Sequence, residues 1–122
     1  MTYCWTTINV RDLEASLAFY RDLLGLPVKR RFAAGEGREI AFLGEGETQV
    51  ELIAGNPGGQ SRFGNDISLG FVVPRTLEDF QELLTARGIQ VEAGPIQPNP
   101  QIRFSYIRDP DGLRIQLVEN LA

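Results

Sequence analysis

Residues 10–28 read V-R-D-L-E-A-S-L-A-F-Y-R-D-L-L-G-L-P-V, and this stretch decides the fold. The chain repeats it in weaker form further on, so that Val73 and Gly88 stand in the places of Val10 and Gly25. A period near half of the chain length indicates that one supersecondary unit has been used twice. The alternative is a pair of unrelated helix and strand units that share only a glycine followed by an aliphatic residue.

Both copies predict an amphipathic helix between two strands. In the first copy, Asp12 stands at an N-cap position and apolar residues follow at helical spacing until Gly25, which predicts a helix over 13–24. In the second copy, Thr76 with an acidic residue three positions later resembles a capping box and predicts a helix over 77–87. The two helices therefore have comparable starts and ends.

Runs of β-branched and alternating residues surround both helices. They predict strands near 3–10, 26–33, 38–44, 48–54, 66–73, 89–93, 102–108 and 113–119. The Pro-rich segment 94–100 is predicted as a bend that either arches over a pocket or serves as a spacer. The fold class is thus α+β, with a βαβββ module over 1–55, a linker over 56–65 and a second βαβββ module over 66–122.

Composition excludes several classes of function. The chain has 122 residues, of which 43% are hydrophobic, and a net charge of −4, which disfavours binding to the phosphate backbone of nucleic acid. No apolar run approaches the ~20 residues of a membrane span, and the first residues lack the pattern of a signal peptide. We therefore expect a cytoplasmic protein with neither nucleic acid nor membrane as a partner.

The chain contains no histidine. This removes serine–histidine and cysteine–histidine nucleophilic pairs, histidine general bases and the commonest protein ligand of transition metals. The single cysteine, Cys4, cannot form an internal disulfide.

The first and last strands of each module carry two different faces. One face is aliphatic and suited to packing under a helix. The other consists of Trp5, Thr7, Asn9, Gln49, Glu51, Ile53, Ser68, Gly70, Val72, Arg114, Gln116 and Val118. This polar but sparsely charged face predicts a pocket for a medium-sized organic molecule. The alternative is a solvent-facing sheet surface, which would more often carry lysine and glutamate than tryptophan and glycine.

Three segments carry a family resemblance. Together with the two βαβββ modules, D-L-E-A-S-L-A-F-Y-R-D-L-L-G-L at 12–26, V-E-L-I at 50–53 and D-P-D-G-L-R-I-Q-L at 109–117 resemble the vicinal oxygen chelate superfamily. This superfamily includes glyoxalase I, bleomycin-resistance proteins, fosfomycin-resistance enzymes and extradiol dioxygenases. The resemblance covers nearly the whole chain and implies curled mixed sheets around a cavity, and a homodimer whose modules lie side by side or are exchanged.

Metal-using members of that superfamily take ligands from the first and fourth strands of each module. The matching positions here are Trp5, Glu51, Ser68 and Gln116, with Asp66 in place of Ser68 if the register shifts by two residues. A transition metal needs about three nitrogen, sulfur or carboxylate donors, and only Glu51 is a good one. We therefore expect no metal and no other cofactor, and neither metal-dependent glyoxalase nor dioxygenase activity.

We expect a metal-independent protein that sequesters a small organic, partly aromatic or cationic ligand, as the bleomycin-resistance branch does. The predicted ligand-binding residues are Trp5, Thr7, Asn9, Phe42, Glu51, Ser68, Phe104, Tyr106 and Gln116. Aromatic rings would stack on the ligand, and the amide and carboxylate groups would fix its polar atoms. Two alternatives remain open: a lyase or isomerase of the glyoxalase-like family that uses Glu51 as general base, and a non-catalytic structural or regulatory dimer.

Overall fold

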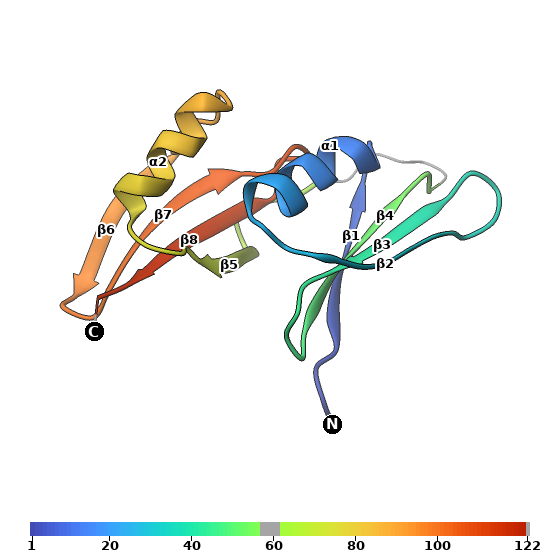
Figure 1. The fold of residues 1–122 in the computed structure, drawn as a ribbon, viewed down its shortest axis with the longest axis horizontal. Helices are drawn as coiled ribbons and strands as arrows, with labels where there is room; N and C mark the ends of the chain where they lie inside the picture. Colours follow the sequence, from blue (N-terminus) through green and yellow to red (C-terminus); the bar gives the residue numbers. More distant parts are fainter. Residues whose placement is uncertain (57–61, 122) are drawn as a thin grey trace. The chain divides into compact units, whose positions relative to one another are not determined.

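The computed structural model describes residues 1–56 and 62–121 of the chain. The chain divides into two compact units, Met1–Arg62 and Phe63–Ala122, called here the N-terminal and C-terminal units. Each unit contains one four-stranded mixed sheet and one helical segment (Figure 1). The α+β fold with two tandem modules is confirmed. Residues 57–61 of the predicted linker lie outside the described residues.

The N-terminal unit follows the order β-α-β-β-β. Its elements are β1 (Trp5–Val10), α1 (Leu13–Leu17), η1 (Ala18–Leu23), β2 (Val28–Ala33), β3 (Glu39–Leu43) and β4 (Gln49–Ala54). The strands lie in the order β1-β4-β3-β2, with β1 parallel to β4 and the other pairs antiparallel. The first strand of the unit therefore lies beside its last.

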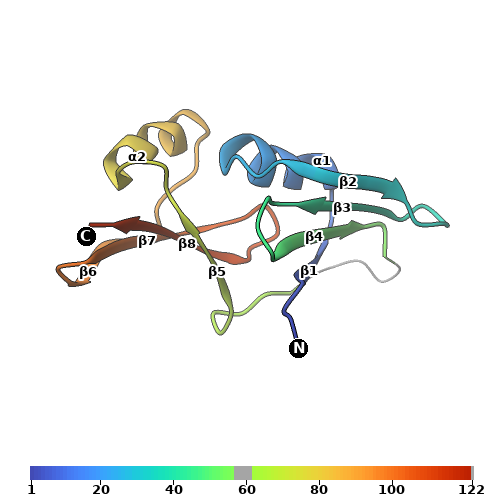
Figure 2. The same cartoon turned by 60° about the horizontal axis from the view of Figure 1, so that its bottom comes forward.

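The C-terminal unit repeats this topology. Its elements are β5 (Ser68–Val72), α2 (Leu77–Ala86), β6 (Ala93–Asn99), β7 (Ile102–Arg108) and β8 (Arg114–Asn120). The strands lie in the order β5-β8-β7-β6, again with one parallel pair, β5 and β8. Figure 2 shows the helical segment of each unit over one face of its own sheet.

The core of each unit lies between its helical segment and its sheet. The fully or nearly fully buried side chains include Ile8, Val10, Leu17, Tyr20, Ala41, Leu43 and Leu52 in the N-terminal unit and Phe80, Leu84, Ile107, Ile115 and Leu117 in the C-terminal unit. Along β1 and β8 the buried residues alternate with more exposed ones, as the sequence pattern predicts, whereas β3 and β4 each carry three consecutive buried residues. Within the described residues, no helix has the length and apolar character needed to cross a membrane.

The helices begin at the predicted caps. Asp12 Oδ1 accepts hydrogen bonds from the backbone N–H groups of Glu14 and Ala15, and Thr76 Oγ1 accepts one from Asp79 N–H. The predicted helix over 13–24 is present, but it is not α-helical throughout. One α-helical turn, α1, is followed by the π-helical segment η1. Wider turns of this kind add one residue per hydrogen-bonded ring.

The predictions of a strand at 89–93 and a bend at 94–100 were wrong. The strand β6 covers most of the Pro-rich segment and begins where the predicted strand ends. Prolines are tolerated in this strand because β6 lies at the edge of its sheet. Pro95 and Pro98 also fall at register shifts between the paired residues. A proline at an irregularity of an edge strand, or with its nitrogen turned away from the partner strand, removes no ladder hydrogen bond.

Gly25 and Gly88 close the helices of the two units with φ of 79° and 69°, in the left-handed region. After α2, Ile89 N–H donates to Leu84 C=O at 2.9 Å, which is the long bond of a Schellman motif. A Cβ at either glycine would meet no atom within 4 Å, so the cost of a substitution comes from the backbone alone.

We expect Gly25→Val and Gly88→Val each to lower the free energy of unfolding by about 1 kcal/mol or more, because a β-branched residue resists positive φ. The measurement is urea unfolding followed by circular dichroism. Gly64→Val is the matched control, since Gly64 also faces open space but has no left-handed φ. Equal stability of all three variants would contradict the assigned helix ends.

Candidate functional site

A row of four side chains crosses the N-terminal sheet on the face opposite to α1 and η1. The strand register pairs Thr7 with Glu51, Glu51 with Phe42, and Phe42 with Arg30. Paired residues on neighbouring strands present their side chains on the same face. The row therefore contains a hydroxyl, a carboxylate, an aromatic ring and a guanidinium in that order.

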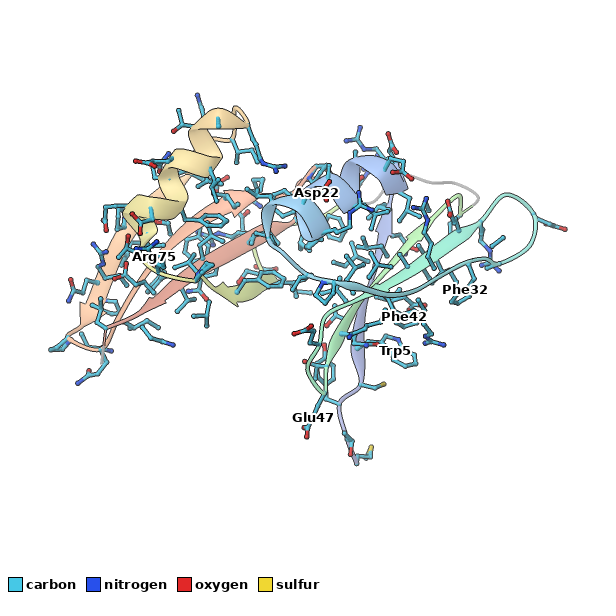
Figure 3. The ribbon with its side chains drawn as sticks, viewed as in Figure 1. Trp5, Asp22, Phe32, Phe42, Glu47 and Arg75 are labelled. Atoms are coloured by element: carbon cyan, nitrogen blue, oxygen red, sulfur yellow. The ribbon has the colours of Figure 1, made fainter. Side chains whose placement is uncertain are left out.

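Aromatic rings surround this row. Trp5 meets Phe42 edge to face, with the ring centres 5.1 Å apart, and Phe32 stacks on Phe42 at 6.4 Å. Figure 3 shows the three side chains on the N-terminal sheet. Phe42 is only 3% exposed, whereas Trp5 is 41% and Phe32 is 42% exposed. We call Trp5, Phe32 and Phe42 the aromatic cluster; its buried centre is Phe42.

Charged and polar groups adjoin the aromatic cluster on both sides. Thr7 Oγ1 donates a hydrogen bond to Glu51 Oε1, and the Glu51 side chain is buried. The Arg30 guanidinium carbon lies 4.3 Å from the centre of the Phe42 ring, which is a cation–π contact. Asn9 accepts a hydrogen bond from Asn56 nearer the end of β1.

The C-terminal sheet carries a second group of side chains on the corresponding face. The register pairs Tyr106 with Gln116, and Gln116 Nε2 lies 3.3 Å from the Tyr106 hydroxyl, to which it donates. Phe104 meets Tyr106 edge to face at 5.7 Å. The Arg114 guanidinium carbon lies 3.7 Å above the centre of the Tyr106 ring. Ser68 is exposed on β5 and paired with Arg114.

The structure therefore places the nine predicted residues in two groups. One group is Trp5, Thr7, Asn9, Phe42 and Glu51 on the N-terminal sheet, and the other is Ser68, Phe104, Tyr106 and Gln116 on the C-terminal sheet. The prediction that these residues line a common cavity stays a prediction.

Sequence reasoning missed Arg30 and Phe32 as members of this face. The run Lys29-Arg30-Arg31 looks like a solvated strand edge, and β2 is indeed the edge strand. Successive residues point to opposite faces, however, so Arg30 lies on Phe42 while Arg31 pairs with Glu39 and Glu14. Hydrogen bonds to these two carboxylates raise the pKa of Arg31 above its ordinary value. The sequence signal that could have placed Arg30 and Phe32 on this face is the alternation of side-chain direction along β2.

A transition metal does not fit the four positions matched to metal ligands. Trp5 offers an indole N–H, which only donates hydrogen bonds, and Ser68 and its alternative Asp66 are exposed. Glu51 supplies a carboxylate, and Gln116 supplies a neutral amide. Across residues 1–56 and 62–121, no three Asp, Glu, Cys or His side chains gather so that they could hold a metal ion.

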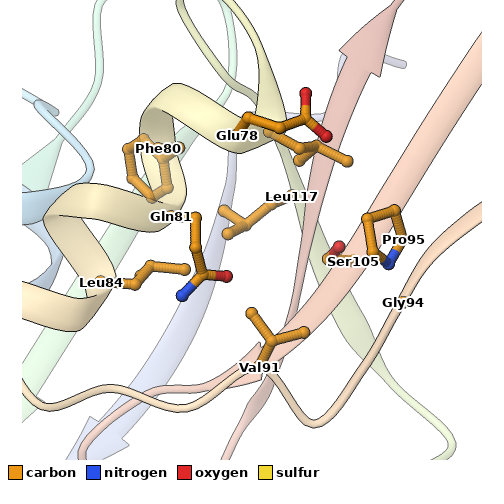
Figure 4. A pocket seen from close by; sticks show the side chains of 10 residues that line it. Glu78, Phe80, Gln81, Leu84, Val91, Gly94, Pro95, Ser105 and Leu117 are labelled. Atoms are coloured by element: carbon orange, nitrogen blue, oxygen red, sulfur yellow. The ribbon is translucent and has the colours of Figure 1, made fainter.

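A cavity of about 310 Å³ lies on the other face of the C-terminal sheet, beside α2. Its lining is mostly apolar and includes Phe80, Leu84, Pro95 and Leu117, with Ser105 among the few polar groups (Figure 4). Gly94 and Pro95 of the Pro-rich segment line this cavity, as one of the two predicted roles of residues 94–100 allows, although they do so from the strand β6 and not from a bend. None of the nine predicted residues lines it.

Comparisons with known proteins agree with this fold. The family model described as the Glyoxalase/Bleomycin resistance protein/Dioxygenase superfamily matches residues 3–117. A lactoylglutathione lyase of Haemophilus influenzae is 30% identical over 122 residues, covering 94% of this chain and 90% of that protein. The uncharacterized protein YwbC of Bacillus subtilis is 33% identical over 120 residues, covering 93% of this chain and 94% of that one.

Among solved structures, the trypanothione-dependent glyoxalase I of Leishmania major has the same fold. Its TM-score is 0.80 at 22% identity, and the match covers 98% of this chain and 86% of that one. Because the family model matches most of the chain and the relatives align over nearly their whole length, the chain belongs to the glyoxalase/bleomycin resistance protein/dioxygenase superfamily.

Proposed function

We propose that this chain is a metal-independent member of its superfamily that binds, and thereby sequesters, a small organic ligand with an aromatic part. The observation that carries the proposal is the aromatic cluster on the helix-free face of the N-terminal sheet. A sheet face exposed only to water would more often carry charged side chains than a tryptophan and a phenylalanine that are both about two-fifths exposed.

The surroundings of the cluster suit the recognition of such a ligand. Trp5 and Phe32 offer partly exposed ring surface for stacking, and Thr7 and Glu51 offer hydrogen-bonding groups next to it. Binding sites for small molecules combine apolar walls with a few fixed polar groups in this way. Sequestration needs affinity alone, so it makes no demand for a catalytic acid, a nucleophile or a metal.

The second candidate is a lyase or isomerase that uses Glu51 as general base. Two observations favour it: the similarity to a lactoylglutathione lyase, and the buried position of the Glu51 carboxylate in the row across the sheet. A carboxylate within hydrogen-bond reach of a bound substrate can remove a proton from it. The expected homodimer, its possible structural or regulatory role, and the cytoplasmic location stay predictions.

The test uses Trp5, the single tryptophan of the chain, whose indole N–H gives one resonance in a nitrogen-edited NMR spectrum. We expect naphthalenemethanol, a neutral aromatic probe, to shift this resonance, and we expect Trp5→Ala to weaken binding by roughly 1–3 kcal/mol in calorimetry because a stacking wall is lost. Leu83→Ala is the control, since Leu83 is an exposed apolar residue on α2. A variant Trp5→Ala that unfolds, or that binds the probe as the wild type does, would contradict the proposal.

Glu51→Gln separates the two candidates. In a binding protein this variant should change the affinity for a neutral probe only slightly, and the wild type should show no lactoylglutathione lyase activity. In an enzyme the wild type should turn over, and Glu51→Gln should remove turnover while binding persists. Turnover that depends on Glu51 would replace the sequestration proposal by the second candidate.

A further inference from the structure

The cavity beside α2 lies entirely within the C-terminal unit. All of its lining residues belong to this unit, and α2 and the strands of the sheet supply most of them. Phe80 and Leu84 of α2 and Leu117 of β8 are buried side chains on its wall. Figure 4 shows the side chains of α2 on one side of the cavity and Ser105 and Pro95 on the other. The walls are therefore mostly apolar.

Two small residues leave this space unfilled, Gly94 on β6 and Ser105 on β7. A Cβ on Gly94 would lie 2.8 Å from Ser105 Oγ, so the missing side chain uncovers the serine. Protein interiors are normally packed without voids much larger than a water molecule, because a void forfeits the contacts of the side chains around it. A molecule that fills about 310 Å³ beside α2 would restore these contacts.

Ser105 supplies a polar group on the wall of the cavity. The residue is only 4% exposed, and its side chain lines the cavity (Figure 4). Its hydroxyl has no hydrogen-bond partner in the part of the chain that the structure describes. A buried hydroxyl without a partner costs free energy, and an oxygen atom of a bound molecule would satisfy it. Ser105 therefore points to a ligand with one hydrogen-bonding oxygen.

The charge at the cavity is already paired. Among the described lining residues, Glu78 is the one charged group, and its two carboxylate oxygens accept hydrogen bonds of 2.7 and 3.0 Å from Arg103. These hydrogen bonds hold the pKa of Glu78 below its ordinary value, so the carboxylate stays ionised and paired at neutral pH. A charged ligand would lose its hydration between apolar walls without gaining a free partner. The cavity therefore favours a neutral molecule.

The volume limits the size of this molecule. An apolar cavity of ~150 Å³ holds a molecule of the size of benzene, so a cavity of about 310 Å³ suits roughly ten non-hydrogen atoms. The lining residues Glu78, Gln81 and Pro95 are exposed, which leaves the cavity open to a ligand from solvent.

We propose that the cavity beside α2 is a second ligand site, which binds a small, neutral, mainly apolar molecule whose single oxygen group hydrogen-bonds to the Ser105 hydroxyl. This inference goes beyond the proposed function. The cavity contains no residue of the aromatic cluster and lies on the helix-covered face of the other sheet. Each site can therefore be tested without the other.

The first test uses cyclohexylmethanol, a neutral alcohol without an aromatic ring to stack on the aromatic cluster. Cyclohexanecarboxylate and cyclohexylmethylammonium have the same ring and carry opposite charges. We expect the alcohol to shift the backbone amide resonances of Leu84 and Leu117 in a nitrogen-edited NMR spectrum, and to bind about tenfold or more tightly than either charged probe. Equal or tighter binding of a charged probe would overturn the inference. An alcohol that does not bind, or that shifts only the Trp5 resonance, would overturn it as well.

The second test compares variants in the same titration. Ser105→Ala should lower the affinity for cyclohexylmethanol about fivefold, because a neutral hydrogen bond is lost. Val91→Phe places a ring at the partly exposed wall and should lower the affinity more than tenfold by filling the cavity. Leu83→Phe is the matched control, since Leu83 is exposed on α2 and does not line the cavity. It should leave the affinity within about twofold.

An unchanged affinity in a folded Ser105→Ala or Val91→Phe variant would contradict the inference. If Val91→Phe does not fold, Ser105→Ala and the three probes decide the question with the wild-type cavity. None of these outcomes changes the test of the aromatic cluster, which depends on Trp5.

Discussion

Replacing Glu119 by alanine is expected to lower the free energy of unfolding by about 3 kcal/mol or more, because this carboxylate is buried and satisfies two donors. Glu119 Oε1 accepts a hydrogen bond of 2.8 Å from the backbone N–H of Leu77 at the start of α2, and one of 2.5 Å from Arg103. Its side chain is only 8% exposed. The substitution would leave the Leu77 N–H and the Arg103 guanidinium without this acceptor inside the unit.

Glu78→Ala is the matched control, since Glu78 binds the same Arg103 with its side chain 63% exposed. An exposed ion pair contributes about 1 kcal/mol or less, so this variant should remain close to the wild type. Both variants are compared in urea unfolding at one pH and ionic strength. If the two substitutions cost the same, the burial of the Glu119 carboxylate does not govern the stability of the C-terminal unit.

Gly94→Ala is expected to lower the free energy of unfolding by about 3 kcal/mol. Alanine is strained at the backbone φ of this position, and its Cβ would have no space. Gly94 has a φ of 107°, and a Cβ there would lie 2.8 Å from Phe104 C=O and 2.9 Å from Ser105 Cα. Backbone atoms in a strand cannot turn aside as a flexible side chain can. The alanine would therefore push β6 away from β7 or distort both.

Gly88→Ala separates the two contributions. It places an alanine at a φ of 69° with nothing within 4 Å, so only the backbone strain of about 1 kcal/mol remains. Thermal unfolding of both variants gives the difference, which measures the steric contribution at Gly94. Equal midpoints would show that β6 does not pack against β7 at this point.

The repeat and the strand faces could be predicted from the sequence because both are local patterns. Asp12 and Thr76 mark the helix starts by their own chemistry, and the alternation around Ile8 and Ile115 marks the buried face of each sheet. A pattern of this kind records which way a side chain points. It carries no information about which side chain lies opposite on the next strand.

For this reason the candidate site could be predicted only in part. Glu51 and Trp5 were found through alternation, whereas the positions of Arg30 over Phe42 and of Arg114 over Tyr106 depend on strand register and side-chain direction, which tertiary packing sets. The expectation of a small organic, partly aromatic or cationic ligand came from the resemblance to the bleomycin-resistance branch. That resemblance gave no information about the guanidinium groups that lie over Phe42 and Tyr106.

The edge strands β2 and β6 have a consequence for the behaviour of the protein at high concentration. An exposed strand edge can pair with the edge of another molecule, and this pairing is a route to aggregation. On β6, Pro95 and Pro98 lack the N–H groups that such a ladder would need, and on β2 the charges of Lys29, Arg30 and Arg31 repel a second copy of themselves. The prolines of segment 94–100 led to the wrong prediction of a bend, and the same prolines protect β6 from intermolecular pairing.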